Sequence, residues 1–265
     1  VAAVAGLRIE STGTIDYGAV SRTLAELVAT RGGDLRTSTE VVGIESRPDQ
    51  VVVTTTHGEV TGDLLVNCAG LHSDTVARMA GLRPEARIVP FRGEYFELRH
   101  DRRDLVRGLI YPVPDPELPF LGVHLTRMMD GSVHAGPNAV TALGRESYSW
   151  RKINVPEAFR DLTYPGFLRM ASKNVGVGLA EVRRSFSKAR FTASLARLVP
   201  GITANDLVRA PAGVRAQAIR PDGGLVDDFL IEHAPRQVHV LNAPSPAATA
   251  SLEIAARIAE QAGLE

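Results

Sequence analysis

The order of elements along the chain predicts a mixed α/β (α+β) fold in which an antiparallel sheet is inserted into an α/β domain. In the N-terminal part, apolar strands alternate with helices whose apolar residues recur every three or four positions. From Arg87 onward, strands joined by tight turns replace this alternation, and the C-terminal part returns to a strand followed by a helix. We therefore predict one domain built from residues 1–86 and 211–265, and a second, inserted domain at residues 87–210.

The first domain opens with elements that carry clear local signals. Asp16 is a good N-cap for the first helix, and His57-Gly58 is a typical turn between two short strands. The buried strand that follows ends in a turn of small residues, Asn67-Cys68-Ala69-Gly70, which lets a ligand approach the backbone closely. The predicted elements are strands at 7–11, 41–44, 50–56 and 63–68, and helices at 17–31 and 73–79.

The inserted domain combines antiparallel strands with a helical segment. Strands are predicted at 88–98 with an interruption at Arg92-Gly93, at 109–111, at 120–128 and at 132–136. The proline-rich loop 112–116 and the turn Asp130-Gly131 separate the later strands. Residues 150–200 are predicted to be mainly helical, with breaks at Pro156, Pro165 and Pro200.

The C-terminal part ends in a strand and a helix that are separated by a turn. Strands at 212–219 and 225–232 flank the turn 221–224, and a short buried strand at 238–241 follows. Ser245 is a good N-cap, and Pro246 suits the first helical position. The first turn, Ala247-Ala248-Thr249, is small and uncharged, so the helix N-terminus is open to an electron-rich group. On these residues alone, an ordinary strand–helix pair is the alternative.

The composition excludes several functional classes. Thirty basic and thirty acidic residues balance, so no basic excess indicates nucleic-acid binding. Cys68 is the only cysteine, which excludes an intrachain disulfide framework and a multi-cysteine metal site. His, Asp and Glu show no spacing typical of a metal site, and no apolar run approaches the ~18 residues of a membrane-spanning helix. A cytosolic protein without a metal site fits these features. The abundance of Ala, Gly and Arg suggests a bacterial source with GC-rich DNA.

Arg215 stands in the segment 212–218, which is otherwise small and mostly apolar, and it therefore needs an anionic partner. One interpretation is a salt bridge with a carboxylate further along the chain, either Asp222, Asp227, Asp228 or Glu232. The other is the carboxylate of a substrate, which an arginine binds with two parallel hydrogen bonds.

Two histidines, His124 and His134, fall in neighbouring strands if the predicted hairpin forms. A single histidine in a strand is usually structural, and His72 is most simply the residue at a helix start.

Six stretches together resemble the D-amino-acid-oxidase-like flavoprotein superfamily, and within it the L-2-hydroxyglutarate oxidase/dehydrogenase family. They are STGTIDYGAV at 11–20, VNCAGLHSD at 66–74, PFRGEYFEL at 90–98, IYPVPDPELPFLGVHLTRMMDGSVHAGPNAV at 110–140, PAGVRAQAIRPDG at 211–223 and LNAPSPAATASLEIA at 241–255. They occur in the order of the family and extend over nearly the whole chain.

The resemblance implies FAD as the cofactor and a remnant of an FAD-binding, Rossmann-like domain. In that superfamily the last helix points its N-terminus at the pyrimidine edge of the flavin, where negative charge collects on reduction. The implied cofactor contacts are Val41, Cys68, Ala69, Gly70, Asn242, Ala243, Pro244, Ser245, Pro246, Ala247, Ala248 and Thr249.

One family feature is absent from this sequence. The superfamily begins with a strand–G-x-G-x-x-G–helix unit that holds the FAD pyrophosphate, whereas here Gly176-Val177-Gly178 is followed by Glu181 in place of the third glycine. The first stretch of this chain that resembles the family corresponds to a position well after the start of the family's sequence. We therefore expect an N-terminally incomplete chain that binds FAD poorly by itself.

The implied reaction is oxidation of the C2 hydroxyl of L-2-hydroxyglutarate to give 2-oxoglutarate. Arg215 would bind the C1 carboxylate, His124 would act as the base, and Arg92 and Tyr95 would bind the distal carboxylate. The electron acceptor would be oxygen or a quinone, and the location cytoplasmic or peripheral on the inner membrane.

Two alternatives to this reaction stay open. One is another oxidase or dehydrogenase of the superfamily, acting on an amino acid or glycerol phosphate. The other is a truncated fragment without catalytic activity that binds a partner.

Overall fold

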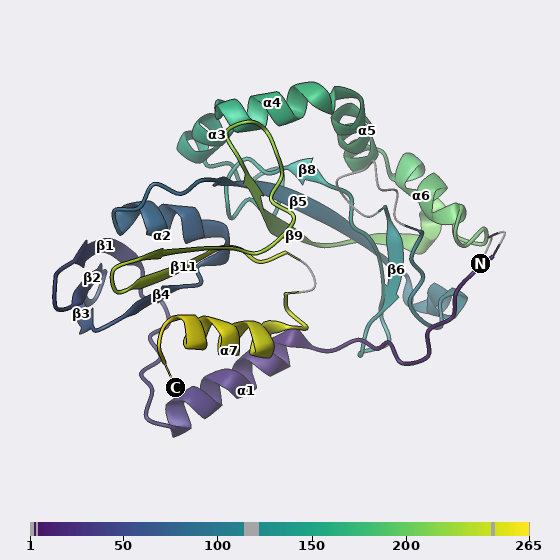
Figure 1. Cartoon of the computed structure of the whole chain (residues 1–265). Helices are drawn as coiled ribbons and strands as arrows, with labels where there is room; N and C mark the ends of the chain where they lie inside the picture. Colours follow the sequence, from purple (N-terminus) through teal and green to yellow (C-terminus); the bar gives the residue numbers. More distant parts are fainter. Residues whose placement is uncertain (1–2, 4, 114–121, 245–246, 265) are drawn as a thin grey trace. The chain divides into compact units, whose positions relative to one another are not determined.

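The computed structural model describes residues 3, 5–113, 122–244 and 247–264, which form two compact units (Figure 1). Unit 1 consists of Val1–Asp16, Pro90–Ala158 and Ala171–Arg215, and unit 2 of Tyr17–Val89, Phe159–Met170 and Ala216–Glu265. The units differ from the predicted domains in four segments, because 1–16 and 211–215 belong to unit 1, and 87–89 and 159–170 to unit 2. The assignment of a separate function to each domain stays a prediction.

Unit 1 is built on an antiparallel sheet with strand order β6-β7-β5-β8, in which β9 also pairs with β5. Its strands are β5 (Arg87–Leu98), β6 (His124–Arg127), β7 (Val133–Gly136), β8 (Val140–Thr141) and β9 (Leu207–Ile219). Its helical elements are α3 (Val155–Leu162), α4 (Pro165–Lys173), α5 (Val175–Phe186), α6 (Lys188–Ala196) and the 3-10 turns η2 (His100–Leu105) and η3 (Ala204–Asp206). The strands β5 and β9 and the helices α3 and α4 continue into unit 2.

The core of unit 1 lies between this sheet and α6. The side chains of α6 pack on β5, β6 and β7, as in the contact of the Phe96 and Phe191 rings with centroids 4.7 Å apart. The alternation of apolar residues along the strands explains this arrangement, because it places one row of side chains on one face of the sheet.

Unit 2 contains two three-stranded sheets. One is the antiparallel meander of β1 (Val41–Ser46), β2 (Val51–Thr55) and β3 (Gly58–Gly62). The other, in the order β10-β11-β4, consists of β10 (Leu230–Ala234), β11 (Gln237–Asn242) and β4 (Leu65–Asn67). The helical elements are α1 (Tyr17–Thr30), η1 (Gly70–His72), α2 (Ser73–Met79) and α7 (Ser251–Gln261).

The pairing of β11 with β4 joins the two ends of the sequence in one sheet. These strands are parallel, with Val238 opposite Val66, whereas β10 and β11 form an antiparallel hairpin. Val238 and Val240 form a small core with Ile258 of α7. A strand–helix unit from each end of the chain therefore contributes to unit 2.

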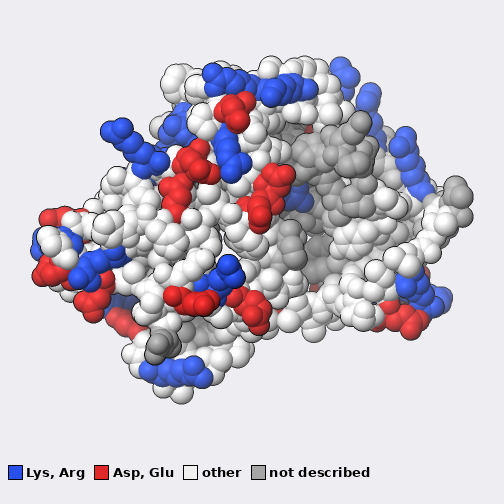
Figure 2. Space-filling view, viewed as in Figure 1, with Lys and Arg blue, Asp and Glu red and all other residues white. Residues whose placement is uncertain are grey.

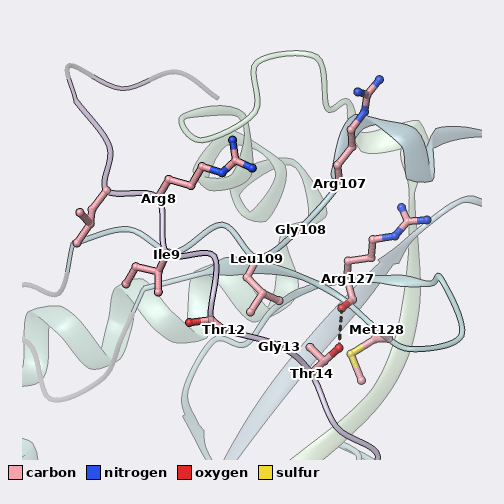
Figure 3. A pocket seen from close by; sticks show the side chains of 11 residues that line it. Arg8, Ile9, Thr12, Gly13, Thr14, Arg107, Gly108, Leu109, Arg127 and Met128 are labelled. Atoms are coloured by element: carbon pink, nitrogen blue, oxygen red, sulfur yellow. Dashed lines mark hydrogen bonds between the residues drawn. The ribbon is translucent and has the colours of Figure 1, made fainter.

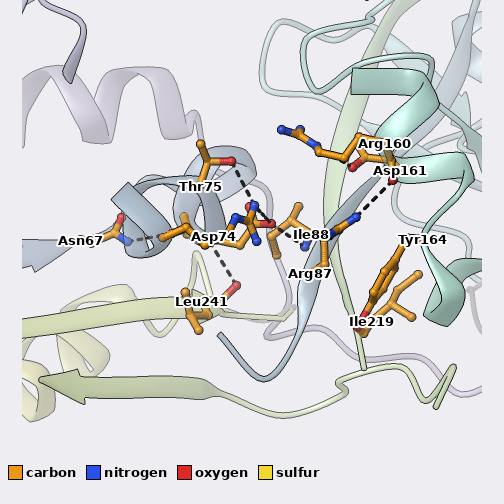
Figure 4. A network of polar contacts seen from close by, with 12 residues as sticks. Asn67, Asp74, Thr75, Arg87, Ile88, Arg160, Asp161, Tyr164, Ile219 and Leu241 are labelled. Carbon is orange, nitrogen blue, oxygen red and sulfur yellow. Dashed lines mark hydrogen bonds and ion pairs between the residues drawn. The ribbon is translucent and has the colours of Figure 1, made fainter. Parts of the chain in front are cut away.

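Buried polar contacts tie α2 to the strands around it (Figure 4). The Asp74 carboxylate is fully buried and accepts hydrogen bonds from Arg78 Nη2 at 2.8 Å and from the backbone N–H of Ile88 at 3.2 Å. Ser73 Oγ donates to the carbonyl of Leu241 at 3.3 Å. These bonds satisfy groups that burial would otherwise penalise, and they fix α2 against β11 and the start of β5.

A second set of contacts in Figure 4 surrounds Tyr164. Its hydroxyl donates to the carbonyl of Ile219 at 3.1 Å, and the Arg87 guanidinium lies 4.5 Å from its ring centroid. Arg87 Nη1 also donates to the carbonyl of Arg160 at 3.1 Å. The segment 159–170 is thereby attached to the strands of unit 2.

The elements defined by local signals are confirmed. The hairpin at His57-Gly58 forms between β2 and β3, the hairpin at Asp130-Gly131 forms between β6 and β7, and α2 begins and ends as predicted. The helix predicted at 17–31 is present as α1, and none of its residues is buried.

Several predicted element boundaries are wrong. Residues 7–11 form no strand, and β5 runs without a break through Arg92-Gly93. The break predicted at Pro165 is present, because α3 ends at Leu162 and α4 begins at Pro165. Pro156 instead lies in the first turn of α3, where the missing N–H costs little. The strand predicted at 225–232 forms only at 230–234, and 109–111 contributes a single bridge between Ile110 and Leu125.

Candidate active site

His124 lies at the start of β6 in unit 1, where the β6–β7 hairpin places it opposite Gly136. Its ring stacks on Tyr111 with centroids 4.4 Å apart and an interplanar angle of 22°. Its Nδ1 lies 3.2 Å from the carbonyl oxygen of Gly122. The geometry requires Nδ1 to carry the proton, because a carbonyl only accepts, and Nε2 then has the free lone pair.

The surroundings of His124 favour the neutral imidazole. Burial lowers the pKa of His124 and the positive charge of Arg215 lowers it further, while the bond to Gly122 acts in the opposite direction. A neutral imidazole with an unprotonated Nε2 can accept a proton at neutral pH.

Arg215 and Tyr95 form a second contact in unit 1, on the paired strands β9 and β5. The Arg215 guanidinium hydrogen bonds to the Tyr95 hydroxyl. Burial raises the pKa of Tyr95, and Arg215 opposes that shift. The Tyr95 and His134 rings are 6.3 Å apart and inclined at 55°, so His134 lies beside the phenol.

These side chains form one cluster, because Tyr111 contacts His124 and acts electrostatically on Tyr95, and Arg215 acts on both His124 and Tyr95. The cluster combines a cation, two phenols and a neutral imidazole, groups suited to binding a carboxylate and removing a proton. The sequence predicted His124, Arg215 and Tyr95 as site residues but missed Tyr111. The feature of the sequence that could have indicated Tyr111 is its position directly before the proline-rich loop 112–116.

Arg92 lies outside this cluster, which corrects the expectation that it binds the distal carboxylate. It is 1% exposed, with Nη2 3.3 Å from Glu94 Oε1 and Nη1 3.3 Å from the carbonyl of Ser147. Its guanidinium also lies 4.2 Å from the centroid of the Trp150 ring. Arg92 and Tyr95 are three positions apart on one strand, so their side chains point to opposite faces of the sheet.

A cavity of about 300 Å³ lies in unit 2, among the ends of β4 and β11 and the first turns of α7. Small and apolar side chains dominate its walls. The predicted cofactor contacts that line it are Cys68, Gly70, Asn242, Ala243 and Ala247. Ala69, Pro244, Ala248 and Thr249 are adjacent in sequence, Val41 at the start of β1 is outside the lining, and Ser245 and Pro246 lie outside the described residues.

A buried network around Asn67 holds the turn that forms one wall of this cavity. Asn67 Nδ2 donates to the carbonyl of Ser73 at 2.8 Å, and its Oδ1 accepts from the N–H of Ala69 at 3.1 Å. The same Nδ2 lies 3.0 Å from His239 Nδ1, and His239 Nε2 lies 2.8 Å from Gln237 Oε1. His239 is therefore protonated on Nε2, and its Nδ1 accepts from Asn67.

The last helix begins later than the sequence predicts. Helix α7 starts at Ser251 with Ala250 as N-cap, and residues 247–250 form a turn. The N–H groups of Ala247 and Ser251 bond three residues back, to the carbonyls of Pro244 and Ala248. Hydrogen bonds to the third preceding residue form a 3-10-like turn instead of an α-helical one, so the α-helix begins later than predicted. The side-chain amide of Asn242 donates to the carbonyls of Val226 and Asp228, so its N–H groups are used within the protein.

The cavity fits one part of FAD. Its uncharged walls suit a flat, largely apolar ring, and Gly70, at φ +54°, leaves open space where a side chain would project. Burial raises the pKa of the Cys68 thiol, so Cys68 adds no negative charge to this wall. The described residues contain no strand–glycine turn–helix unit for the pyrophosphate, because Gly176 and Gly178 lie inside α5, after another helix instead of a strand.

A second cavity, of about 620 Å³ in unit 1, was not predicted (Figure 3). The segment 7–14 and the end of β6 line it, and Thr14 Oγ1 lies 3.5 Å from the carbonyl of Arg127. Two of its arginines have protein partners, since Arg8 pairs with Glu10 and Arg127 donates to the carbonyl of Val106. Among the described residues, no cluster of three or more His, Cys, Asp or Glu side chains could hold a metal ion.

Comparison with known proteins gives a consistent result. A family model described as FAD dependent oxidoreductase (DAO) matches residues 2–261. The chain is 47% identical to an L-2-hydroxyglutarate dehydrogenase of Indibacter alkaliphilus over 98% of its own length and 66% of the relative. It is 42% identical to the Escherichia coli K12 enzyme of that name, over 97% of this chain and 61% of the relative. It is 40% identical to the mitochondrial human enzyme, over 94% of this chain and 58% of the relative. The chain thus spans about three fifths of the length of these curated relatives.

Solved structures share the fold at lower sequence identity. An FAD-bound L-alpha-glycerophosphate oxidase from Mycoplasma pneumoniae matches with a TM-score of 0.66 and 19% identity, over 92% of this chain and 55% of the other. Glycine oxidase from Geobacillus kaustophilus matches with a TM-score of 0.56 and 16% identity, over 93% of this chain and 54% of the other. At these identities the likeness concerns the fold alone.

Proposed function

Because this chain belongs to the FAD dependent oxidoreductase family, we propose that its protein oxidises the C2 hydroxyl of L-2-hydroxyglutarate to the ketone of 2-oxoglutarate. The similarity to L-2-hydroxyglutarate dehydrogenases over at least 94% of the chain supports this substrate. The main structural support for this reaction is the cluster of Arg215, Tyr95 and a neutral His124 in unit 1.

Arg215 binds the C1 carboxylate in this proposal. A guanidinium offers two parallel N–H donors that match a carboxylate. The bond from Arg215 to the Tyr95 hydroxyl limits the rotation of the guanidinium before substrate binds, which lowers the entropic cost of binding. Replacement of Arg215 distinguishes this role from the alternative, in which a carboxylate of the protein is the partner of Arg215.

His124 accepts the proton of the C2 hydroxyl at Nε2. The bond from its Nδ1 to Gly122 fixes the tautomer, and the stack on Tyr111 fixes the plane of the ring. Both constraints act before the substrate arrives, and such preorganisation keeps a base within reach of the proton it removes.

FAD, when bound, supplies the acceptor for the hydride that leaves C2. Within this chain, Cys68, Gly70, Ala243 and Ala247 would contact part of it through the uncharged walls of the unit 2 cavity. Tyr95 is the remaining candidate for the distal carboxylate, since its hydroxyl belongs to the cluster and Arg92 does not.

The electron acceptor and the location extend this proposal. Oxygen fits a cytoplasmic protein, and a quinone would require a peripheral position on the inner membrane. No helix among the described residues has both the length and the apolar character needed to cross a membrane.

The proposal is tested by anaerobic flavin reduction in the FAD-loaded protein. We expect rapid bleaching with L-2-hydroxyglutarate, and slow or no bleaching with D-2-hydroxyglutarate, glutamate, glycine and glycerol 3-phosphate. Faster reduction by an amino acid or by glycerol 3-phosphate would assign the protein to another reaction of the superfamily. Absence of reduction by the whole panel, in protein that retains FAD, would favour a fragment without catalytic activity.

A further inference from the structure

The cavity of about 620 Å³ in unit 1 has an excess of positive charge (Figure 3). Arg8, Arg107 and Arg127 line it, and no Asp or Glu side chain does. Figure 2 shows basic and acidic side chains close to one another over much of the surface in view, and the whole chain has no net charge. The cavity therefore concentrates positive charge locally, as a site for an anion does.

The three arginines differ in how far the protein uses their donors. The Arg107 side chain is exposed in the loop after η2 and makes no hydrogen bond or ion pair with any residue that the structure describes. Arg8 pairs with Glu10 at 3.0 Å, but the two side chains are 87% and 76% exposed, and so exposed a pair is weak. Arg127 Nη1 donates to the carbonyl of Val106 at 3.1 Å, which fixes the guanidinium. Even with Glu10 counted, the cavity keeps an excess of two positive charges.

The rest of the lining is largely apolar. Leu7, Ile9, Leu109 and Met128 contribute to it, and Ile9 is 59% exposed. A ligand that covered these side chains would remove apolar surface from water, which favours binding. A small inorganic anion would satisfy the arginines but would leave this apolar wall in water. The lining therefore fits an anion that also has an apolar part.

The two sides of the cavity are fastened to each other within unit 1. Thr14 Oγ1 lies 3.5 Å from the carbonyl of Arg127, so the segment 7–14 is held at the end of β6. Ile110 and Leu125 exchange backbone hydrogen bonds of 2.8 and 2.9 Å, which place the loop before Ile110 beside the same strand. The cavity is thus formed before a ligand arrives, and this lowers the entropic cost of binding.

We propose that this cavity binds a nucleoside diphosphate. Guanidinium groups form paired hydrogen bonds with phosphate oxygens, so Arg8, Arg107 and Arg127 would hold the diphosphate. The flat base would pack on Ile9 and Leu109. A volume of about 620 Å³ lies in the range usual for small-molecule sites and exceeds the needs of a phosphate ion.

The substrate of the proposed reaction fits this cavity less well. L-2-hydroxyglutarate has two negative charges, but its short polar chain would leave Ile9 exposed. None of Arg215, Tyr95 and His124 lines the cavity, so it is a different site from the cluster described above. The inference does not depend on the proposed reaction, because it requires neither turnover nor FAD.

The experiment is equilibrium dialysis of the chain against radiolabelled ADP, with excess FAD present so that ADP does not occupy a cofactor site. We expect about one ADP per chain, and binding that weakens as salt is added. Pyrophosphate, adenosine and 2-oxoglutarate, each used as a competitor, should bind at least tenfold more weakly than ADP, because each lacks either the apolar part or the two phosphates.

Two variants test the two halves of the site. Arg107→Glu reverses a charge in an exposed loop and should weaken ADP and pyrophosphate alike, at least tenfold. Ile9→Ser shortens the apolar wall and should weaken ADP several-fold while leaving pyrophosphate unchanged. Matched controls are Arg83→Glu, an exposed charge in unit 2, and Val113→Ser, an exposed apolar residue of unit 1 outside the cavity. Both controls should bind ADP as the parent does, and thermal melts confirm that every variant folds.

Several results would overturn the proposal. One is failure of the parent to bind ADP in the presence of FAD, and another is ADP binding that Arg107→Glu and Arg83→Glu weaken equally. Binding that excess FAD displaces and that Arg107→Glu leaves unchanged would place ADP at a cofactor site instead. Equal affinities for ADP and 2-oxoglutarate would show that the cavity selects charge alone, and would exclude a nucleotide as its specific occupant.

Discussion

Arg215 is the residue whose replacement separates substrate binding from a structural ion pair. In FAD-loaded protein, Arg215→Met should weaken binding of L-2-hydroxyglutarate by roughly 2–5 kcal/mol, because a charged pair is lost and a carboxylate is left without its donors. The melting temperature should change little. Substrate titration and thermal melts of the same preparations measure both effects.

Arg215→Lys is the matched control for charge. An ammonium lacks the planar pair of donors, so lysine should restore little of the affinity. A large drop in melting temperature for Arg215→Met, with affinity retained, would instead show that Arg215 serves a protein carboxylate such as Asp222 or Glu232.

Protonation of His124 should cause the fall in the rate of flavin reduction at low pH. Because burial and Arg215 lower its pKa below the usual ~6.5, His124 is neutral at pH 7 and becomes protonated only at lower pH. The rate of flavin reduction should therefore be constant near neutral pH and fall as the pH drops through that lowered pKa. His124→Gln should reduce the rate about 10²-fold and remove this fall at low pH, with FAD content unchanged. An unchanged rate and pH profile in His124→Gln would make His124 structural, with His134 beside Tyr95 the next candidate.

His239 should make the stability of unit 2 depend on pH. Burial lowers the pKa of His239, with a further decrease from His233, so the folded state holds the neutral ring. The unfolded chain binds a proton on His239 at a higher pH than the folded chain does. The stabilisation that the neutral, buried ring provides is therefore complete above pH ~6.5 and is lost as the pH falls below that value. Protonation would also place a donor on Nδ1 opposite the Asn67 amide.

The measurement for His239 is the melting temperature between pH 7.5 and 5 (roughly the range around the unperturbed value). The parent should lose stability on the acid side of this range, and His239→Gln should be less stable at pH 7.5 but lose less on acidification. His57, which is exposed in the β2–β3 turn, offers His57→Gln as a control with the pH dependence of the parent. Parallel curves for the parent and His239→Gln would remove His239 from the acid response.

Among the secondary-structure elements, those predicted well are those whose signals lie within a few residues. The turn residues of the β2–β3 and β6–β7 hairpins specify the backbone locally, so sequence alone located them. Residues 7–11 have an apolar pattern but no partner strand among the described residues, and Leu7 is 89% exposed. A strand needs neighbours that its own sequence does not encode.

The same distinction applies to the candidate site. Arg215 could be singled out because a charge in an apolar strand is unusual, whereas the role of His124 followed only from the resemblance to the flavoprotein family. The burial of Arg92 by Trp150 and Glu94, and the stack of Tyr111 on His124, depend on contacts between segments distant from each other in the chain. No spacing in the sequence encodes these contacts.

Strand β5 runs unbroken because of glycine at one position. A Cβ added to Gly93 would lie 2.8 Å from Pro137 Cβ, closer than side chains tolerate. Gly93→Ala should therefore destabilise unit 1 by about 1–3 kcal/mol, the usual cost of overpacking. The measurement is denaturant unfolding followed by circular dichroism.

Gly108 is the matched control for Gly93. It lies in a loop of the same unit, and a Cβ there would meet nothing within 4 Å. Gly108→Ala should be neutral or slightly stabilising, because it reduces the freedom of the unfolded chain. Equal effects of the two substitutions would mean that the contact with Pro137 does not limit β5.

At the scale of the whole molecule, the chain divides its chemistry between two units. The cluster of Arg215, Tyr95 and His124 belongs to unit 1, and the uncharged cavity at the start of α7 belongs to unit 2. Each is formed by segments far apart in sequence, so neither could survive as a short peptide. The remaining question at this scale is how much of the cofactor these 265 residues can hold.

We expect this chain to bind FAD weakly. The pyrophosphate is normally held by the N–H groups of a glycine-rich turn and the helix that follows a strand, and this sequence has no such unit. The unit 2 cavity of about 300 Å³ offers apolar contact to one part of the molecule only. The purified chain should therefore carry well under one flavin per chain by its visible spectrum, with the E. coli K12 relative, prepared in the same way, as the reference. Added FAD should be removed by gel filtration, and Ala247→Trp, which fills the cavity, should abolish the residual binding. Stoichiometric yellow protein that withstands gel filtration would contradict this expectation and would mean that the contacts in unit 2 suffice to hold the cofactor.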